Sequence, residues 1–152
     1  MRDMRETIDT ALKDALKRQD KRRISTLRLI RAAIQDRDIV NRGAGKDPVS
    51  GEEILQILSK MVKQREESAK AYEDGNRLDL AEQERGEIAI IRDFMPRQLG
   101  DEQVRQACQQ VITEVGGEGL RDMGKCMAAL KERYPGQMDF AKASGVVKSL
   151  LQ

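Results

Sequence analysis

The sequence predicts an all-α protein, with an N-terminal domain of about four helices and a small C-terminal domain of three helices. Charged residues make up 36% of the 152 residues and aromatic residues only 3%, so the core must come from aliphatic side chains and Met. Apolar residues recur at intervals of three and four positions, and no segment alternates between apolar and polar residues as a half-buried strand does. A chain of this length buries enough surface to fold without disulfides or metal ions.

Turn-forming residues delimit the first helices. Segments 3–18 and 20–42 are predicted helices, and the second ends at the stretch 43–50, which is rich in Gly, Asp and Pro. Ser50, followed three positions later by Glu53, is a capping-box pattern that begins a third helix.

The third helix is expected to run to Asp74. Gly75 suits the left-handed conformation that ends a helix, and Asn76 suits the cap of the next one. The fourth helix ends near Met95, because Pro96 disfavours helical geometry in the residue before it.

Three shorter helices are expected after this point. Their predicted ranges, which GGEG and a Pro-Gly pair separate, are 101–115, 121–134 and 140–151. The link of residues 96–100 is the expected boundary between an N-terminal domain of residues 1–95 and a C-terminal tail domain of residues 96–152.

One charge falls inside the apolar face of the third helix. Arg65 shares that face with Ile54, Ile57, Leu58, Met61, Val62, Ala69 and Tyr72. A charge there needs a partner, and Glu84 lies on the apolar side of the fourth helix. Because a tight turn joins these helices, we expect them to be antiparallel and Arg65 to pair with Glu84. Such a pair fixes register more often than it serves chemistry.

Apolar residues cover most of the circumference of the second helix, so we expect neighbours to pack on more than one of its sides. These residues are Leu27, Leu29, Ile30, Ala33, Ile34, Ile39 and Val40. The polar residues form one column of Arg28, Arg31, Gln35, Asp38 and Arg42. The column is either the solvent side of a mostly buried helix, with Asp38 pairing with Arg42, or a basic ridge that follows a phosphate backbone.

The absence of histidine restricts the possible chemistry. It excludes a Ser-His-Asp triad, a Cys-His pair and His-ligated zinc. Cys108 and Cys126 fall on apolar helix faces and are too few for a four-thiolate metal site. Helical spacing separates the acids of residues 79–87, so they are not expected to bind a metal ion together. We therefore predict no catalytic residue, no metal site and no cofactor. The two cysteines, the charged first residues and the lack of a long apolar run predict a cytoplasmic protein without a membrane anchor.

The segment from Gly119 to Lys125 matches the spacing of a phosphate-binding loop. Cys126 stands where such a loop needs Ser or Thr, and the preceding residues form a helical pattern instead of a strand. A weaker interpretation remains open, in which free N–H groups before the next helix hold a phosphate together with Arg121 and Lys125. The alternative is a glycine turn that joins two helices.

Four stretches carry a resemblance to a known family. They are STLRLIRAAI (25–34), KQREESAKAYEDGNRLDLAEQERGEI (63–88), FMPRQL (94–99) and DMGKCM (122–127). Together they resemble the YqeY-like family, whose last third is similar to the helical tail domain of the B subunit of glutamine-dependent aspartyl/glutamyl-tRNA amidotransferase. The resemblance implies a helical domain followed by a tail domain of the kind that contacts tRNA. Gly100 and Cys126 depart from the residues usual in the family, Ser and Val.

Charge and resemblance together predict an accessory module that binds tRNA or another structured RNA, beside an amidotransferase or an aminoacyl-tRNA synthetase. The expected RNA contacts are Arg28, Arg31, Arg121, Lys125 and Lys148. This function requires the basic residues of the tail to gather on one side. Two alternatives remain open. One is a component of a carbon–nitrogen ligase with glutamine as amido donor, which the resemblance also implies, and the other is a protein–protein adaptor.

Overall fold

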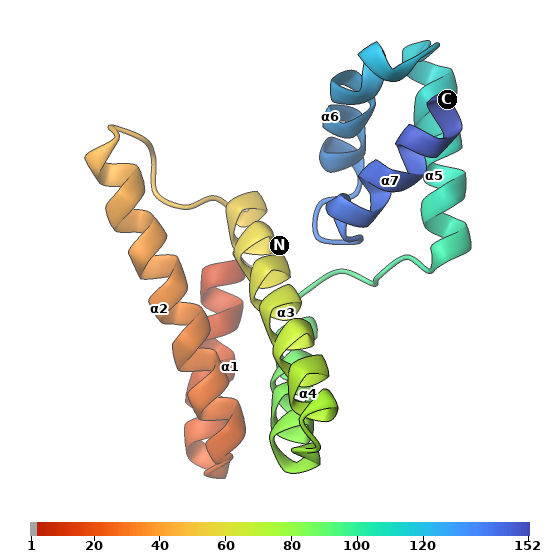
Figure 1. Cartoon of the computed structure of the whole chain (residues 1–152). Coiled ribbons are helices and arrows are strands. Elements are labelled where there is room, and N and C mark those ends of the chain that lie inside the picture. Colours follow the sequence, from red (N-terminus) through yellow and green to blue (C-terminus); the bar gives the residue numbers. More distant parts are fainter. Residues whose placement is uncertain (1–2) are drawn as a thin grey trace. The chain divides into compact units, whose positions relative to one another are not determined.

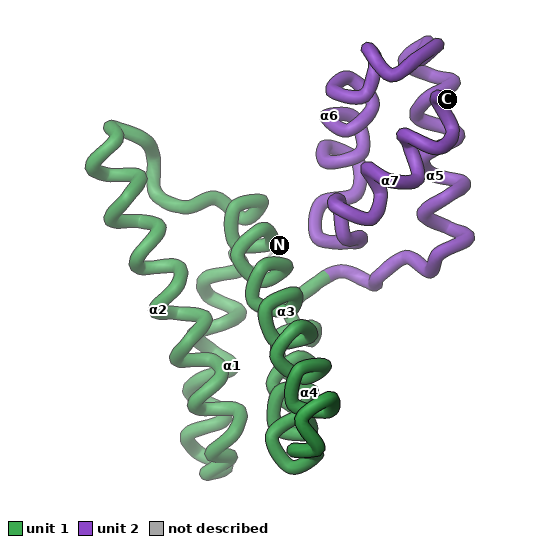
Figure 2. Tube along the Cα trace, viewed as in Figure 1, with its two compact units in different colours: residues 1–95 green, residues 96–152 purple. Residues whose placement is uncertain are grey.

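The computed structural model describes residues 3–152, and every regular element in that range is a helix (Figure 1). The all-α prediction is therefore confirmed. The chain forms two compact units, with the division between Met95 and Pro96 (Figure 2). The first unit holds α1 (Met4–Arg18), α2 (Lys21–Gly43), α3 (Gly51–Asp74) and α4 (Leu78–Arg92); the second holds α5 (Asp101–Val115), the 3-10 turn η1 (Leu120–Asp122), α6 (Met123–Arg133) and α7 (Phe140–Leu151). None of these helices has the length and apolar content needed to cross a membrane.

Short polar side chains begin the long helices of the first unit. Asp20 precedes α2, and its carboxylate accepts the backbone N–H of Arg23 at 3.2 Å. The predicted capping box begins α3: the Ser50 hydroxyl accepts the N–H of Glu53 at 3.2 Å, and the Glu53 carboxylate accepts the N–H of Ser50 at 3.4 Å. These bonds satisfy N–H groups that have no partner inside the helix.

The turn between α3 and α4 differs from the prediction by one residue. The left-handed residue is Asn76, with φ 58°, whereas Gly75 has φ −86°. Asn tolerates this conformation better than most residues because its side chain is short and polar. The N–H of Arg77 donates to the carbonyl of Tyr72 at 2.7 Å and closes the turn. The two helices then run antiparallel, as predicted.

The chain winds more tightly between the end of helix α4 and Pro96. Its regular part ends at Arg92, and the following residues to Met95 continue with bonds to the carbonyl three residues back, from the N–H of Asp93 at 3.2 Å to that of Met95 at 3.1 Å. Such a 3-10 continuation is common at a helix end. It accounts for the three residues between the observed end and the predicted one.

The core of the first unit comes from one face of each of its helices. The main cluster of buried apolar residues comprises Ile8, Leu12, Ala15, Leu27, Ile30, Ile34, Ile54, Leu58, Met61, Val62, Ile88 and Ile91, together with Val49 from the loop before α3. The expectation that neighbours pack on several sides of α2 is wrong. Leu29, Ile39 and Val40 remain 46%, 65% and 64% exposed, because α1, α3 and α4 all pack on the opposite side of α2.

The buried charge on α3 pairs with a different acid from the one predicted. Arg65 Nε lies 3.0 Å from an oxygen of Glu87, and both side chains are at least 85% buried, with 15% and 13% exposure. The pairing with Glu84 is wrong because the connection between the helices centres on Asn76. Residues equally distant from that centre come level, and Arg65 and Glu87 are each eleven positions from Asn76.

The second unit is a bundle of three helices around its own core. The buried residues are Ala107, Cys108, Val111, Cys126, Leu130, Met138, Ala143, Val147 and Leu151. Gly117, in the loop after α5, has little room for a side chain. A Cβ atom there would lie 3.3 Å from both Cys126 Sγ and Ile112 Cγ2, and 3.4 Å from Leu151 Cδ2. The end of α5, the beginning of α6 and the end of α7 therefore meet at this loop.

Candidate nucleic-acid interface

Asp38, the acid of the polar column on α2, forms its ion pair with a residue of α1. The guanidinium of Arg5 donates to both carboxylate oxygens of Asp38, at 2.9 and 2.6 Å, and the N–H of Val49 donates to one of them at 2.9 Å. The predicted pairing of Asp38 with Arg42 is therefore wrong. The bonds from Arg5 and Val49 lower the pKa of Asp38 from 3.8 to about 2. Asp38 thus faces α1, and the exposed part of the column keeps only its basic and neutral members.

The basic members of the column have different surroundings. Arg31 Nε lies 3.2 Å from an oxygen of Asp9 on α1, although its side chain is still 45% exposed. Arg28 and Arg42 are exposed, and neither makes an ion pair within residues 3–152. Lys21 begins the same line, since residues 21, 28, 35 and 42 are seven positions apart. Sequence analysis placed Arg42 in the polar column but not among the expected RNA contacts, and it left out Lys21, which this seven-residue spacing would have included.

A shallow cavity lies between α1 and α2 beside this line. Its volume is about 90 Å³, and it is lined by Arg5, Ile8, Asp9, Arg31, Ile34 and Gln35. Sites for small molecules usually have roughly 300 Å³ or more, so a nucleoside does not fit. Both arginines in its wall are already paired with acids, Arg5 with Asp38 and Arg31 with Asp9. The cavity therefore does not add a separate anion site.

The three candidate contacts of the tail lie at one end of the second unit. Lys125 Nζ donates to the last carbonyl of α5, that of Val115, at 3.0 Å. Arg121 is next to the same loop and lies 3.7 Å from Glu118, with both side chains at least 80% exposed. Lys148 is exposed in the last turn of α7, three residues before Leu151, whose side chain reaches the loop at Gly117. The structure thus brings these three cations to the same end.

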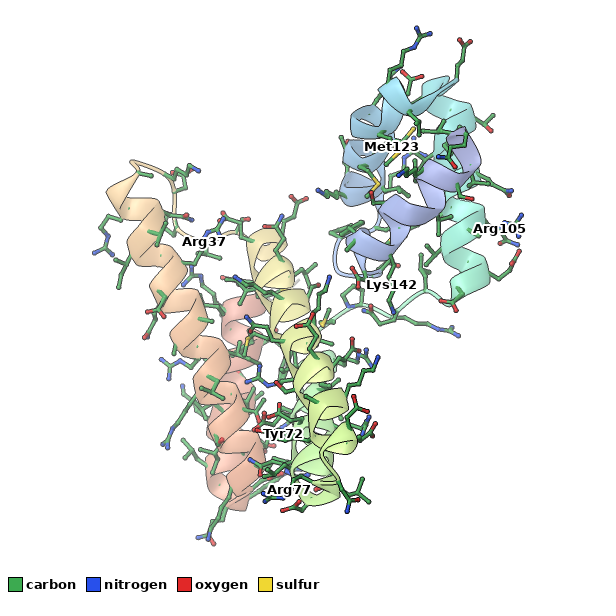
Figure 3. All side chains as sticks on the ribbon, in the orientation of Figure 1. Arg37, Tyr72, Arg77, Arg105, Met123 and Lys142 are labelled. Atoms are coloured by element: carbon green, nitrogen blue, oxygen red, sulfur yellow. The ribbon has the colours of Figure 1, made fainter. Side chains whose placement is uncertain are left out.

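Other basic residues of the tail do not join them. Lys142 lies in the first turn of α7, and Arg105 lies near the start of α5. Figure 3 shows both of them away from Met123, where α6 begins. The basic residues therefore occupy both ends of the unit, and the expectation that they gather on one side is wrong for the tail as a whole. Only Arg121, Lys125 and Lys148 lie at a common end.

The loop that resembles a phosphate site already holds a carboxylate. Asp122 Oδ2 accepts the N–H of Glu118 at 2.9 Å and that of Gly119 at 3.4 Å. The bond from Glu118 and, less strongly, the one from Gly119 lower the pKa of Asp122, so it is ionised at neutral pH. The expectation that these two N–H groups are free to hold a phosphate is wrong, because the carboxylate of Asp122 already accepts both of them. The segment also follows a helix, α5, instead of the strand that a phosphate-binding loop requires.

The cysteines lie in the core, as predicted. Cys108 and Cys126 are both fully buried, and burial raises the pKa of each thiol. Neither thiol is therefore activated as a nucleophile. Between residues 3 and 152 no group of three or more Cys, Asp or Glu side chains is placed to hold a metal ion.

Comparison with known proteins gives one family match and several relatives. A protein of Schizosaccharomyces pombe is 31% identical over 85 residues, which cover 56% of this chain and 66% of the relative. Two further relatives are both named Altered inheritance of mitochondria protein 41, mitochondrial. The one from Meyerozyma guilliermondii is 32% identical over 117 residues, 72% of this chain and 59% of the relative. The one from Lachancea thermotolerans is 31% identical over 84 residues, 55% of this chain and 43% of the relative.

This chain covers less than two thirds of the length of each of these three relatives. The family match is much more extensive. A family model described as Yqey-like protein matches residues 5–151. Since that range includes nearly the whole chain and both compact units, the protein belongs to the YqeY-like family.

Proposed function

We propose that this protein is an accessory module that binds tRNA or another structured RNA and has no self-contained active site. The RNA contacts in this proposal are Arg28 and Arg31 on α2, and Arg121, Lys125 and Lys148 at the loop end of the second unit. Lys21 and Arg42 extend the first of these surfaces. Phosphate contacts supply most of the affinity in such binding and make it dependent on salt.

The observation that carries the proposal is the pairing of arginines in the first unit. Between residues 3 and 95, every arginine except Arg28 and Arg42 makes an ion pair with Asp or Glu. These two arginines are exposed on the same line of α2. They are fourteen residues apart, which is about 21 Å along the helix. Two exposed cations on one line, neither of them in an ion pair with another described residue, support contact with an extended polyanion.

The aromatic residues support a structured RNA over a single strand. The chain has two Tyr, two Phe and no Trp, and single-strand binding depends on stacking bases against such rings. One of the rings, Phe94, is covered by the guanidinium of Arg23 at 5.6 Å. Recognition through shape and phosphates needs no exposed ring.

Titration of the full chain with a labelled tRNA transcript tests this proposal. Affinity should fall between about 50 and about 200 mM salt, and Arg28→Ala should reduce the slope against log salt by about 1. Lys70→Ala is the matched control, since Lys70 is an exposed cation on α3, away from the α2 line. Absence of binding at the lower salt concentration, or the same slope for both variants, would contradict the proposal.

The accessory role in this proposal includes a protein partner that acts on tRNA, either an amidotransferase or an aminoacyl-tRNA synthetase. Its support is the sequence resemblance, which implies that the tail is similar to a domain of the amidotransferase B subunit. We expect the purified chain to release no ammonia from glutamine, and release would overturn the accessory role. Two cysteines without a disulfide support a reducing compartment. We propose the cytoplasm, which cell fractionation tests.

A further inference from the structure

The exposed side of α2 carries apolar residues that the RNA proposal does not use. Among residues 3–152, six large apolar side chains are exposed, and half of them are Leu29, Ile39 and Val40 on this one helix. Ala32 is exposed between them. At about 100° per residue these four fall within a sector of about 100° on the helix surface. We call Leu29, Ala32, Ile39 and Val40 the α2 apolar patch.

A single acid lies in the middle of the α2 apolar patch. Asp36 falls between Ala32 and Leu29 in helical projection and is exposed. Within residues 3–152 it makes no ion pair or side-chain hydrogen bond, whereas Asp38 is held by Arg5. Any surface that covers the patch must also cover this charge. A charge that loses its water needs a counter-charge, so the occupant must bring a cation to Asp36.

This combination distinguishes between possible occupants. RNA phosphates are repelled by Asp36, and they gain nothing from Ile39 or Val40. A second copy of the chain is also disfavoured. Pairing of α2 with itself about a two-fold axis through the patch would bring the two copies of Asp36 together. An apolar helix with a basic residue satisfies both the apolar side chains and the acid.

We infer that the α2 apolar patch binds an amphipathic helix of another protein, with Lys or Arg in the middle of its apolar face opposite Asp36. From Leu29 to Val40 the patch extends about 16 Å, or three helical turns, so a partner helix of about twelve residues covers it. The line of Arg28 and Arg42 stays on the flank of this surface. The inference therefore does not depend on RNA binding.

Two synthetic helical peptides of about sixteen residues test the inference. Both carry Leu at every third or fourth position, and they differ only in a central Lys or Glu. The full chain should bind the Lys peptide about tenfold more tightly than the Glu peptide in fluorescence anisotropy. Ile39→Ser should weaken binding of the Lys peptide by about tenfold, because it removes a large side chain from the contact. Asp36→Lys should reverse the preference between the peptides.

Leu78→Ser is the matched control, because Leu78 is 64% exposed like Val40 but lies on α4. It should leave peptide binding unchanged. Ile39 and Asp36 are both exposed, so their variants should unfold at the same temperature as the wild type, which a thermal scan checks. Ile39→Ser should also leave tRNA affinity unchanged, which separates failure of this inference from failure of the RNA proposal.

Four results would overturn the inference. Equal affinity for both peptides would show that Asp36 does not select the basic residue. Unchanged affinity of Ile39→Ser for the Lys peptide would show that the α2 apolar patch is not the binding surface. A dimer in light scattering that Ile39→Ser dissociates would assign the surface to a second copy. Loss of tRNA affinity in Ile39→Ser, without any peptide binding, would assign it to RNA.

Discussion

The guanidinium of Arg5 on α1 donates two hydrogen bonds, of 2.9 and 2.6 Å, to the carboxylate of Asp38 on α2. The same guanidinium donates to the carbonyl of Val49 at 3.2 Å, and the N–H of Val49 donates to Asp38 at 2.9 Å. One carboxylate thus joins two helices and the loop that leads to α3. Bidentate bonds between ionised groups are stronger than neutral ones, so this junction should matter for stability.

The first prediction concerns the pH dependence of that junction. The pKa of Asp38 is about 2 in the folded chain and 3.8 ordinarily, so ionised Asp38 stabilises the fold above the ordinary value. That contribution is lost as the pH falls through about 2. The difference in melting temperature between the wild type and Asp38→Asn should be constant above pH 5 and shrink from pH 4 toward pH 2.

Asp36→Asn is the control on the same helix, because Asp36 is exposed and makes no ion pair within residues 3–152. It should change the melting temperature much less than Asp38→Asn at pH 7. A difference for Asp38→Asn that is the same at pH 7 and pH 2 would show that its ionisation contributes nothing.

The second prediction concerns Arg65 and Glu87. Their side chains are 15% and 13% exposed, so removing one partner leaves the other charge largely buried. Glu87→Gln should lower the free energy of unfolding by about 2 kcal/mol or more, whereas replacing both residues by apolar ones should cost much less. Urea denaturation measures both. Glu84→Gln, at the acid predicted from the sequence, should have little effect, and an equal loss there would contradict the observed pairing.

Local signals predicted the helices well. The capping box at Ser50 and Glu53 and the end of α4 before Pro96 depend on residues only a few positions apart, so the sequence contains all the information they need. The partner of Arg65 was missed by one helical turn. Its identity depends on the length of the α3–α4 connection, which the pattern of apolar residues does not fix.

Long-range contacts were the harder part of the candidate site. Asp38 finds its partner 33 residues earlier in the chain, at Arg5, and helical spacing within α2 pointed to Arg42 instead. For the same reason, the exposure of Ile39 and Val40 could not be predicted from the sequence. Spacing shows which side chains share a face of a helix, but only tertiary packing decides which faces a neighbour covers.

The third prediction concerns two glycines of the second unit. A Cβ atom at Gly117 would lie 3.3 Å from Cys126 Sγ and Ile112 Cγ2, closer than ordinary contact. Gly117→Ala should therefore destabilise the chain by about 1 kcal/mol or more, since core atoms must move. A Cβ atom at Gly124, on α6, has no neighbour within 4 Å, so Gly124→Ala should stabilise by about 0.5 to 1 kcal/mol. Urea denaturation measures both variants. If Gly117→Ala and Gly124→Ala changed the free energy of unfolding in the same direction, the tight packing inferred at Gly117 would be contradicted.

The fourth prediction separates the two roles of the lysines at the loop end of the second unit. Lys125 donates to the carbonyl of Val115 at 3.0 Å, whereas Lys148 is exposed and makes no ion pair within residues 3–152. Both Lys125→Ala and Lys148→Ala should weaken tRNA binding and each reduce the salt slope by about 1. Only Lys125→Ala should also lower the melting temperature, because it leaves a carbonyl at the end of α5 without its partner. Lys142→Ala, at the other end of the unit, is the control and should change neither quantity. If Lys142→Ala reduced the slope as much as Lys148→Ala, positive charge anywhere on the unit would serve, and a defined contact surface at the loop end would be ruled out.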